Sequence, residues 1–189
     1  MNDFQRIKWI DTLKGIGIIL VLIGHFIEPY LADNCIVNTM FTIVYSFHMP
    51  LFCMLSGVVA KKNVKRVLLY YCWIYIISQL IYLGAVRIHL LGYDISSNRL
   101  YDTYILPFWH LWYLYALILW SISLYIIDIL QKHIPRCLIL VFTYTISILC
   151  GFIDVEKPYG LMRVFTFYPF FLFGYFYKGF LNSEKWGVE

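Results

Sequence analysis

Long apolar runs, separated by short breaks that carry the charges, dominate the hydrophobic pattern of this chain. Each run comes close to the roughly 17–25 residues that an α-helix needs to cross the hydrocarbon layer of a membrane. Lipid offers no partner to the open backbone groups of an isolated sheet, so we expect helices. The pattern predicts an all-α protein, a polytopic transmembrane bundle of about six spans: Ile10–Tyr30, Ile36–Ala60, Val67–Val86, Ile105–Leu130, Cys137–Ile153 and Leu161–Tyr177.

Composition excludes a soluble globular domain. Hydrophobic residues make up 61% of the chain and charged residues only 14%, whereas a soluble domain carries about 25% charged residues. The first run is not a cleaved signal peptide, because it contains Asp11, Lys14 and His25 and no small-residue cleavage site follows it. We therefore expect a multi-pass protein that is integral to the inner, or plasma, membrane and whose main partner is the lipid bilayer.

The basic residues alternate between loops, and this alternation predicts the orientation. Arg6 and Lys8 precede the first run, and a basic cluster spans residues 61–66. The loop that holds Glu28 and Asp33 has no Lys or Arg. By the positive-inside rule the N-terminus, the basic cluster and the C-terminus lie in the cytoplasm. The net charge of +4 is spread over short loops rather than one face, so we expect no nucleic-acid partner.

Three ionisable residues in the first span are candidates for function, because charges inside a membrane are costly unless they are paired or hydrated. Lys14 and His25 are eleven residues apart, close to three helical turns, and Asp11 precedes Lys14 by three. We expect one stripe formed by Asp11, Lys14, Ile18, Val21 or Leu22, and His25. Asp11 and Lys14 alone would suit an interfacial ion pair. His25 on the same face favours function, since imidazole can take a proton from a hydroxyl.

Glycines on the same span would let a neighbouring helix or a thin ligand approach closely. They are Gly15, Gly17 and Gly24.

The second span contains Phe47-His48-Met49-Pro50, in which a proline interrupts the helical hydrogen-bond ladder. His48 lies beside the expected kink. Two interpretations stay open: His48 contacts substrate, or it donates a hydrogen bond to a carbonyl that Pro50 frees.

Two further segments offer substrate-binding candidates. His110 and Trp112 open the fourth span, where the simplest interpretation is an interfacial aromatic belt. The functional alternative is a stacking platform for a sugar ring. Arg163 opens the sixth span, where it either snorkels to the outer headgroups or faces a polar cavity. Arg66, at the start of the third span, is able to bind a phosphate group bidentately.

Several other chemistries find no support in the chain. It has no P-loop, no nucleophile-elbow motif and no zinc-protease motif. The five cysteines form no C-x-x-C pair and most fall within apolar runs, which favours buried packing. We expect no metal.

Five segments, taken together and in order, resemble the acyltransferase 3 family, and the branch related to fucose 4-O-acetylase in particular. The resemblance covers essentially the whole chain. Its motifs are Trp9-Ile10-Asp11-Thr12-Leu13-Lys14-Gly15-Ile16-Gly17 with His25, Ser46-Phe47-His48-Met49-Pro50-Leu51-Phe52 with Leu55-Ser56-Gly57, Lys65-Arg66-Val67-Leu68-Leu69-Tyr70-Tyr71, Leu111-Trp112-Tyr113-Leu114, and Arg163-Val164 with Pro169-Phe170-Phe171-Leu172-Phe173-Gly174-Tyr175.

The resemblance implies a membrane O-acetyltransferase that uses cytoplasmic acetyl-CoA to modify a hydroxyl of a glycan or related cell-envelope acceptor. It implies His25 as the base, Lys14 where the family often has arginine, and Arg66 as a donor-binding residue. Lysine keeps the charge but loses the planar fork of arginine. Family members usually have more spans than the six predicted here. We therefore expect residues 1–189 to form one transmembrane acyltransferase domain that is incomplete at its C-terminus.

Two other functions stay open from the sequence. A polytopic transporter or flippase would also carry polar groups and broken helices at mid-membrane, although it would be expected to contain internal repeats. An inactive fragment would only pack against a partner.

Overall fold

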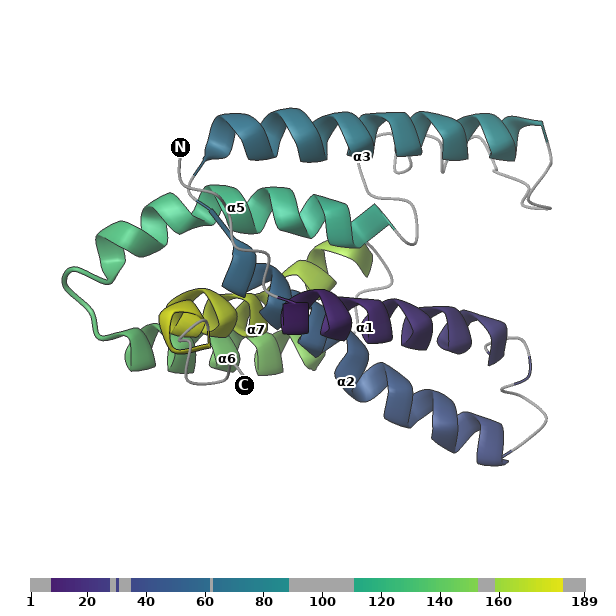
Figure 1. Cartoon of the computed structure of the whole chain (residues 1–189), viewed down its shortest axis with the longest axis horizontal. Helices are drawn as coiled ribbons and strands as arrows, with labels where there is room; N and C mark the ends of the chain where they lie inside the picture. Colours follow the sequence, from purple (N-terminus) through teal and green to yellow (C-terminus); the bar gives the residue numbers. More distant parts are fainter. Residues whose placement is uncertain are drawn as a thin grey trace. The chain divides into compact units, whose positions relative to one another are not determined.

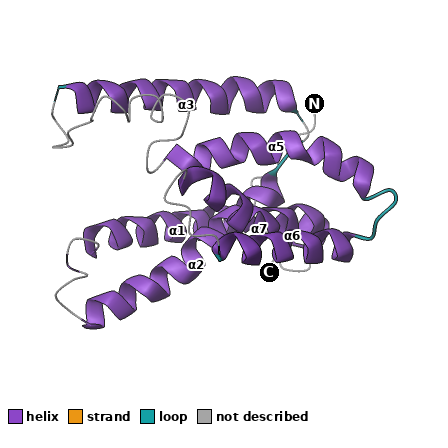
Figure 2. Cartoon of the chain, turned by 180° about the vertical axis from the view of Figure 1, so that it is seen from behind, coloured by secondary structure: helices purple, strands orange, loops and turns teal. Residues whose placement is uncertain are grey.

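The structure is a computed structural model that describes residues 8–27, 30, 35–61, 63–88, 111–152 and 159–181 (Figure 1). Throughout these residues the regular structure is helical, as the colouring of Figure 2 shows. The predicted all-α class is therefore confirmed. The helices are α1 (Lys8–Ile27), α2 (Cys35–Val59), α3 (Val64–Arg87), α5 (Trp112–Leu130), α6 (Arg136–Gly151) and α7 (Tyr159–Leu181).

The predicted spans agree with these helices to within a few residues wherever both are described. One exception is the predicted start of the fourth span, since residues 105–110 lie outside the described part of the chain. Three described helices are long and apolar enough to cross a membrane, and two shorter apolar helices accompany them, at Leu69–Ala85 and Arg136–Gly151. The long ones are Ile10–Ile27, Cys35–Val59 and Trp112–Leu130.

The chain divides into two compact units. Unit 1 comprises Met1–Ala60 and Phe170–Glu189, and unit 2 comprises Lys61–Pro169. Helix α7 therefore contributes its second half to unit 1 and its first half to unit 2.

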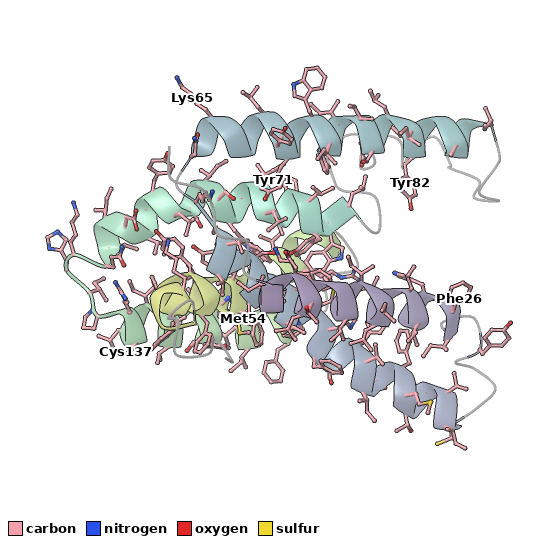
Figure 3. All side chains as sticks on the ribbon, in the orientation of Figure 1. Phe26, Met54, Lys65, Tyr71, Tyr82 and Cys137 are labelled. Carbon is pink, nitrogen blue, oxygen red and sulfur yellow. The ribbon has the colours of Figure 1, made fainter. Side chains whose placement is uncertain are left out.

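In unit 1, α1 packs against α2 as an antiparallel hairpin (Figure 1). The core of this hairpin consists of Ile10, Leu55 and Val58, with Leu13 and Leu51 packed against it. The opposite side of α1 is exposed and apolar, and includes Phe26 (Figure 3). Large apolar side chains that point outward are typical of a helix whose surroundings are lipid.

Two glycines bring the backbones of α2 and α7 together in unit 1. A methyl group added at Gly57 would collide with the backbone carbonyl of Phe171, and one added at Gly174 would collide with the carbonyl of Met54. Such reciprocal small-residue crossings are a common way for membrane helices to associate, because lipid supplies no hydrophobic drive between them.

In unit 2, α3 packs against α5, and a short turn connects α5 to α6. The last turn of α5 is closed by hydrogen bonds from the Gln131 and Ile134 amides to the Ile127 and Leu130 carbonyls, at 2.9 and 2.8 Å. Pro135 is the N-cap of α6, with an extended backbone. Its fixed φ and missing N–H suit this position, where the chain leaves one helix and begins another.

Side chains of α5 and α6 hold the first half of α7 by hydrogen bonds. The indole N–H of Trp120 donates to the Val164 carbonyl at 3.1 Å, and the Ser147 hydroxyl donates to the Thr166 carbonyl at 2.7 Å. The Ser123 hydroxyl and the Tyr168 phenol lie 2.7 Å apart. These bonds satisfy polar groups at the helix contacts inside unit 2.

Candidate functional site

Two close contacts fix the register of α1 against α2. A methyl group added at Gly17 would lie 2.6 Å from the Phe52 ring, and one added at Gly24 would lie 2.8 Å from the Tyr45 ring. Because the glycines are seven residues apart on α1 and the rings are seven apart on α2, the helices run antiparallel in one constant register. Val21 then lies opposite His48. The predicted close approach is confirmed at both glycines.

The third glycine of the predicted set behaves differently. Gly15 is exposed, and a methyl group added there would meet nothing within 4 Å. It lies on the side of α1 that points away from α2.

His48 is buried beneath α1, between these two contacts. Its side chain is 2% exposed, and Nδ1 lies 2.6 Å from the Val44 carbonyl oxygen. The Tyr45 ring meets the imidazole edge-on at 4.7 Å, and Phe41 stacks on Tyr45 at 3.9 Å. A carbonyl oxygen only accepts, so Nδ1 is the donor. In the neutral ring this leaves Nε2 with its lone pair free to accept a hydrogen bond.

The partner of His48 corrects one of the two sequence-based interpretations. Pro50 has no N–H for the carbonyl four residues before it, which belongs to Ser46. The imidazole instead donates to Val44, four residues before His48 itself. This carbonyl is the ordinary helical partner of the His48 amide, so the bond does not repair the proline gap. It fixes the ring orientation and the tautomer.

His25 lies on the same hairpin, one turn beyond the residue opposite His48. Its side chain is half-buried, and the two imidazoles are close enough to interact electrostatically. A neutral imidazole is the form that accepts a proton.

The predicted stripe on α1 is partly corrected. Lys14, Val21 and His25 are half-buried and form one edge of the hairpin contact. Ile18 and Leu22, in contrast, are 54% and 53% exposed. The contact with α2 is centred on Gly17 and Gly24. Ile18 and Leu22 therefore lie outside the contact.

Asp11 and Lys14 interact electrostatically, as their three-residue spacing predicts. Asp11 is exposed, whereas Lys14 is half-buried. The carboxylate thus lies at the outer margin of the hairpin and the ammonium group lies further in.

Unit 2 brings together two of the predicted substrate-binding residues. The Arg163 guanidinium carbon lies 5.7 Å from the centre of the Trp112 ring, a cation–π distance. Phe167 stacks on the same indole at 5.3 Å, and Trp112 is 7% exposed. The indole therefore already has an aromatic and a cationic neighbour from α7. His110 lies outside the described residues.

The donor-binding candidate falls at the first turn of α3. Arg66 belongs to that helix, but its side chain is outside the described part of the chain. The neighbouring Lys61 and Lys65 are exposed. In Figure 3, Lys65 projects from α3 on the side away from α5. Within the described residues, no group of three His, Cys, Asp or Glu side chains is arranged to hold a metal ion.

Sequence reasoning missed Tyr45 and a polar stripe on α3. Tyr45 carries the edge contact to His48, and its position three residues before the imidazole was the available signal. The Tyr75 ring of α3 lies 6.0 Å from the Tyr115 ring of α5, and Gln79 of α3 is 6% exposed. The helical period of these polar residues was the available signal.

Comparison with known proteins gives one family and one curated relative. A family model for the acyltransferase 3 group, described as an acyltransferase domain, matches residues 7–187. The nodulation protein NolL of Sinorhizobium fredii (strain NBRC 101917 / NGR234) is 41% identical over 59 residues. That stretch is 30% of this chain and 16% of NolL, so the match spans less than a fifth of the relative. No solved structure matches the chain.

Proposed function

The chain belongs to the acyltransferase 3 family, and we propose that it transfers an acetyl group from acetyl-CoA to a hydroxyl of a glycan or related cell-envelope acceptor. We further propose that it crosses the plasma membrane several times with a cytoplasmic N-terminus. The observation that supports the transfer most directly is the imidazole pair. His25 and His48 interact across a hairpin in which two glycines bring the helices close together.

His25 is the proposed general base. It accepts the proton of the acceptor hydroxyl as the oxygen attacks the thioester carbonyl carbon. The new C–O bond forms, the C–S bond breaks, and the departing CoA sulfur takes the proton back from the imidazolium. The imidazole is then neutral again, and no external oxidant or reductant is required.

The other proposed roles follow from charge and hydrogen-bonding capacity. His48 accepts a hydrogen bond from substrate through Nε2, because its Nδ1 proton is already donated to Val44. Lys14, with Asp11 beside it, supplies positive charge near the donor or the developing oxyanion. Arg66 binds donor phosphate.

Three further residues are proposed to bind the acceptor. They are His110, Trp112 and Arg163.

The proposal is tested by replacing His25 in membranes supplied with labelled acetyl-CoA. We expect His25→Ala to lower transfer of label to glycan by about 10²–10⁴-fold, which is the usual contribution of a general base. The matched control is Leu22→Ala, which removes an exposed side chain from the same helix. Equal membrane insertion of both variants, followed by normal transfer in His25→Ala, would remove His25 from the mechanism. Solute flux without labelled glycan in the parent protein would instead support a transporter.

A further inference from the structure

Helix α3 places its polar residues inward and its apolar residues outward. Between residues 69 and 82 the exposed side chains are those of Leu69, Tyr70, Trp73, Ile74, Ile76, Ile77, Leu80 and Ile81. The protected ones, which we call the α3 stripe, are Tyr71, Cys72, Tyr75, Ser78, Gln79 and Tyr82. Their spacing follows the helical period, so they share one face. Polar groups on the protein side of a membrane helix either join it to a neighbouring helix or face a ligand.

This stripe belongs to a helix that packs on α5. Figure 3 shows Tyr82 leaving α3 on the α5 side, opposite to Lys65. The Tyr75 ring lies 6.0 Å from the Tyr115 ring of α5. Gln79, one turn further along, is 6% exposed. Hydroxyl and amide groups therefore gather along the contact between the two helices.

Hydrogen bonds between helices explain part of this arrangement, but not Tyr75. Polar side chains commonly join membrane helices to each other. The Tyr75 hydroxyl oxygen, however, is buried and has no hydrogen-bond partner among the described residues. Burying a hydroxyl without a partner is unfavourable, and phenylalanine would fill nearly the same space without that penalty. The hydroxyl therefore lowers the stability of the ligand-free protein, with no hydrogen bond to offset the loss.

We propose that the α3 stripe, together with Tyr115, is a substrate-binding site, and that the Tyr75 hydroxyl hydrogen-bonds to a hydroxyl or amide group of the bound substrate. The proposal rests on the proposed acetyl transfer, which supplies two sources of this chemistry. The pantetheine arm of the acyl donor carries amides, and the glycan acceptor carries hydroxyls. Neither source requires a charge in the site, and none of the six residues of the stripe is charged.

The decisive variant is Tyr75→Phe, compared with Tyr70→Phe as a matched control. Tyr70 is on the same helix, five residues away, and is 63% exposed on the opposite face. KM is measured for acetyl-CoA at saturating acceptor, and for the acceptor at saturating acetyl-CoA. We expect Tyr75→Phe to raise one of the two KM values about tenfold with little change in kcat, because a binding hydrogen bond is lost. The KM that rises identifies the source. Tyr70→Phe should change neither.

Thermal unfolding in detergent supplies the second readout. Removing an unpartnered hydroxyl should leave the melting temperature of Tyr75→Phe unchanged or higher. A lower melting temperature together with unchanged KM values would show that the hydroxyl serves packing alone, and would overturn the proposal.

Failure of the proposed function is distinguishable from failure of this site. If the parent protein transfers no label, the shift in melting temperature caused by acetyl-CoA, or by a free oligosaccharide, is compared between the parent and Tyr75→Phe. A shift that is lost in Tyr75→Phe and kept in Tyr70→Phe supports the site without catalysis. Equal shifts in all three proteins, or none in any of them, overturn it. If His25→Ala abolishes transfer while Tyr75→Phe behaves like Tyr70→Phe, the function stands and the site does not.

Discussion

The two units hold helix α7 against its neighbours in different ways: unit 1 by close contact at glycines, and unit 2 by hydrogen bonds from tryptophan and serine side chains. In unit 1 the helices approach until the backbones of α2 and α7 touch at Gly57 and Gly174. In unit 2 the first half of α7 is held by side-chain hydrogen bonds from Trp120 and Ser147 to its backbone. Both solutions answer the same difficulty, which is that apolar helices gain little from leaving lipid for one another.

The difference between the units also concerns how polar groups are fixed. The close-packed hairpin of unit 1 holds His48 in one orientation and one tautomer, through a single bond to its own helix. Unit 2 spreads its polar groups over helix contacts, and leaves the Tyr75 hydroxyl with no partner among the residues described. The Nδ1 proton of His48 is thus already committed to its own helix. The Tyr75 hydroxyl is still available to a ligand, because none of the described residues bonds to it.

The largest expected effect comes from adding a side chain at the glycine crossing between α2 and α7 in unit 1. Gly57→Ala and Gly174→Ala each place a methyl group against a backbone carbonyl that a rotamer change cannot move aside. We expect each to destabilise the protein by about 3 kcal/mol, the upper range for overpacking. The measurement is thermal or denaturant unfolding in detergent. Gly84→Ala is the control, because a methyl group at Gly84 meets nothing within 4 Å. Unchanged stability in both crossing variants would contradict the close contact.

The next effect separates the two nitrogens of His48. Asparagine places its amide N–H where Nδ1 lies, and so keeps the bond to the Val44 carbonyl but removes Nε2. Glutamine reaches the Nε2 position but loses the Nδ1 donor. We expect His48→Asn to remain as stable as the parent and to lose transfer by about ten- to a hundredfold, as for a lost hydrogen bond to a reacting group.

His48→Gln should show the opposite balance. Its stability falls by about 1 kcal/mol, because the Val44 bond is lost, and it retains more activity than His48→Asn. Full activity in His48→Asn would show that His48 acts only by holding its own helix. Rates of labelled acetyl transfer and melting temperatures, measured on the same preparations, decide between the two.

Much of the helical framework was predictable, because a membrane helix is recognised in a sequence by the length and hydrophobicity of its apolar run. The shared side of Lys14 and His25 followed from counting turns, and both are half-buried. The spacing did not predict which residues of α1 lie at the centre of its contact with α2. Placing Ile18 outside it required knowing that Gly17 meets an aromatic ring of α2.

Neither contacts between distant segments nor side-chain rotamers could be predicted from residue spacing. Arg163 and Trp112 meet through the packing of α7 on α5, which no spacing encodes. One of the two interpretations of His48 placed its partner at the proline gap, but the rotamer directs Nδ1 to Val44. The α3 stripe, in contrast, was readable from its period. Tyrosine is also common at membrane interfaces, so the period alone does not separate an inward-facing stripe from an interfacial belt.

A smaller effect is expected where unit 2 uses a hydroxyl instead of a glycine. Ser147→Ala removes the bond from α6 to the Thr166 carbonyl of α7 with little change in volume. We expect a loss of about 0.6–1 kcal/mol in unfolding free energy, in line with single hydrogen bonds between membrane helices. Thr145→Val is the matched control, since the Thr145 hydroxyl is exposed and donates to the Val141 carbonyl of its own helix. If the two variants lose the same unfolding free energy, the bond between α6 and α7 stabilises the protein no more than a bond within one helix.

The smallest effect is one of sign, and it tests the register on which the site of unit 1 depends. Gly15→Ala adds a methyl group in open space and should stabilise α1 by about 0.5 kcal/mol through helix propensity. Gly17→Ala, two residues along, adds a methyl group 2.6 Å from the Phe52 ring and should destabilise by about 1 kcal/mol as the ring yields. If both substitutions stabilise, α1 does not present Gly17 to α2. The half-buried edge that carries Lys14 and His25 is then turned elsewhere, and His25 loses its place beside His48.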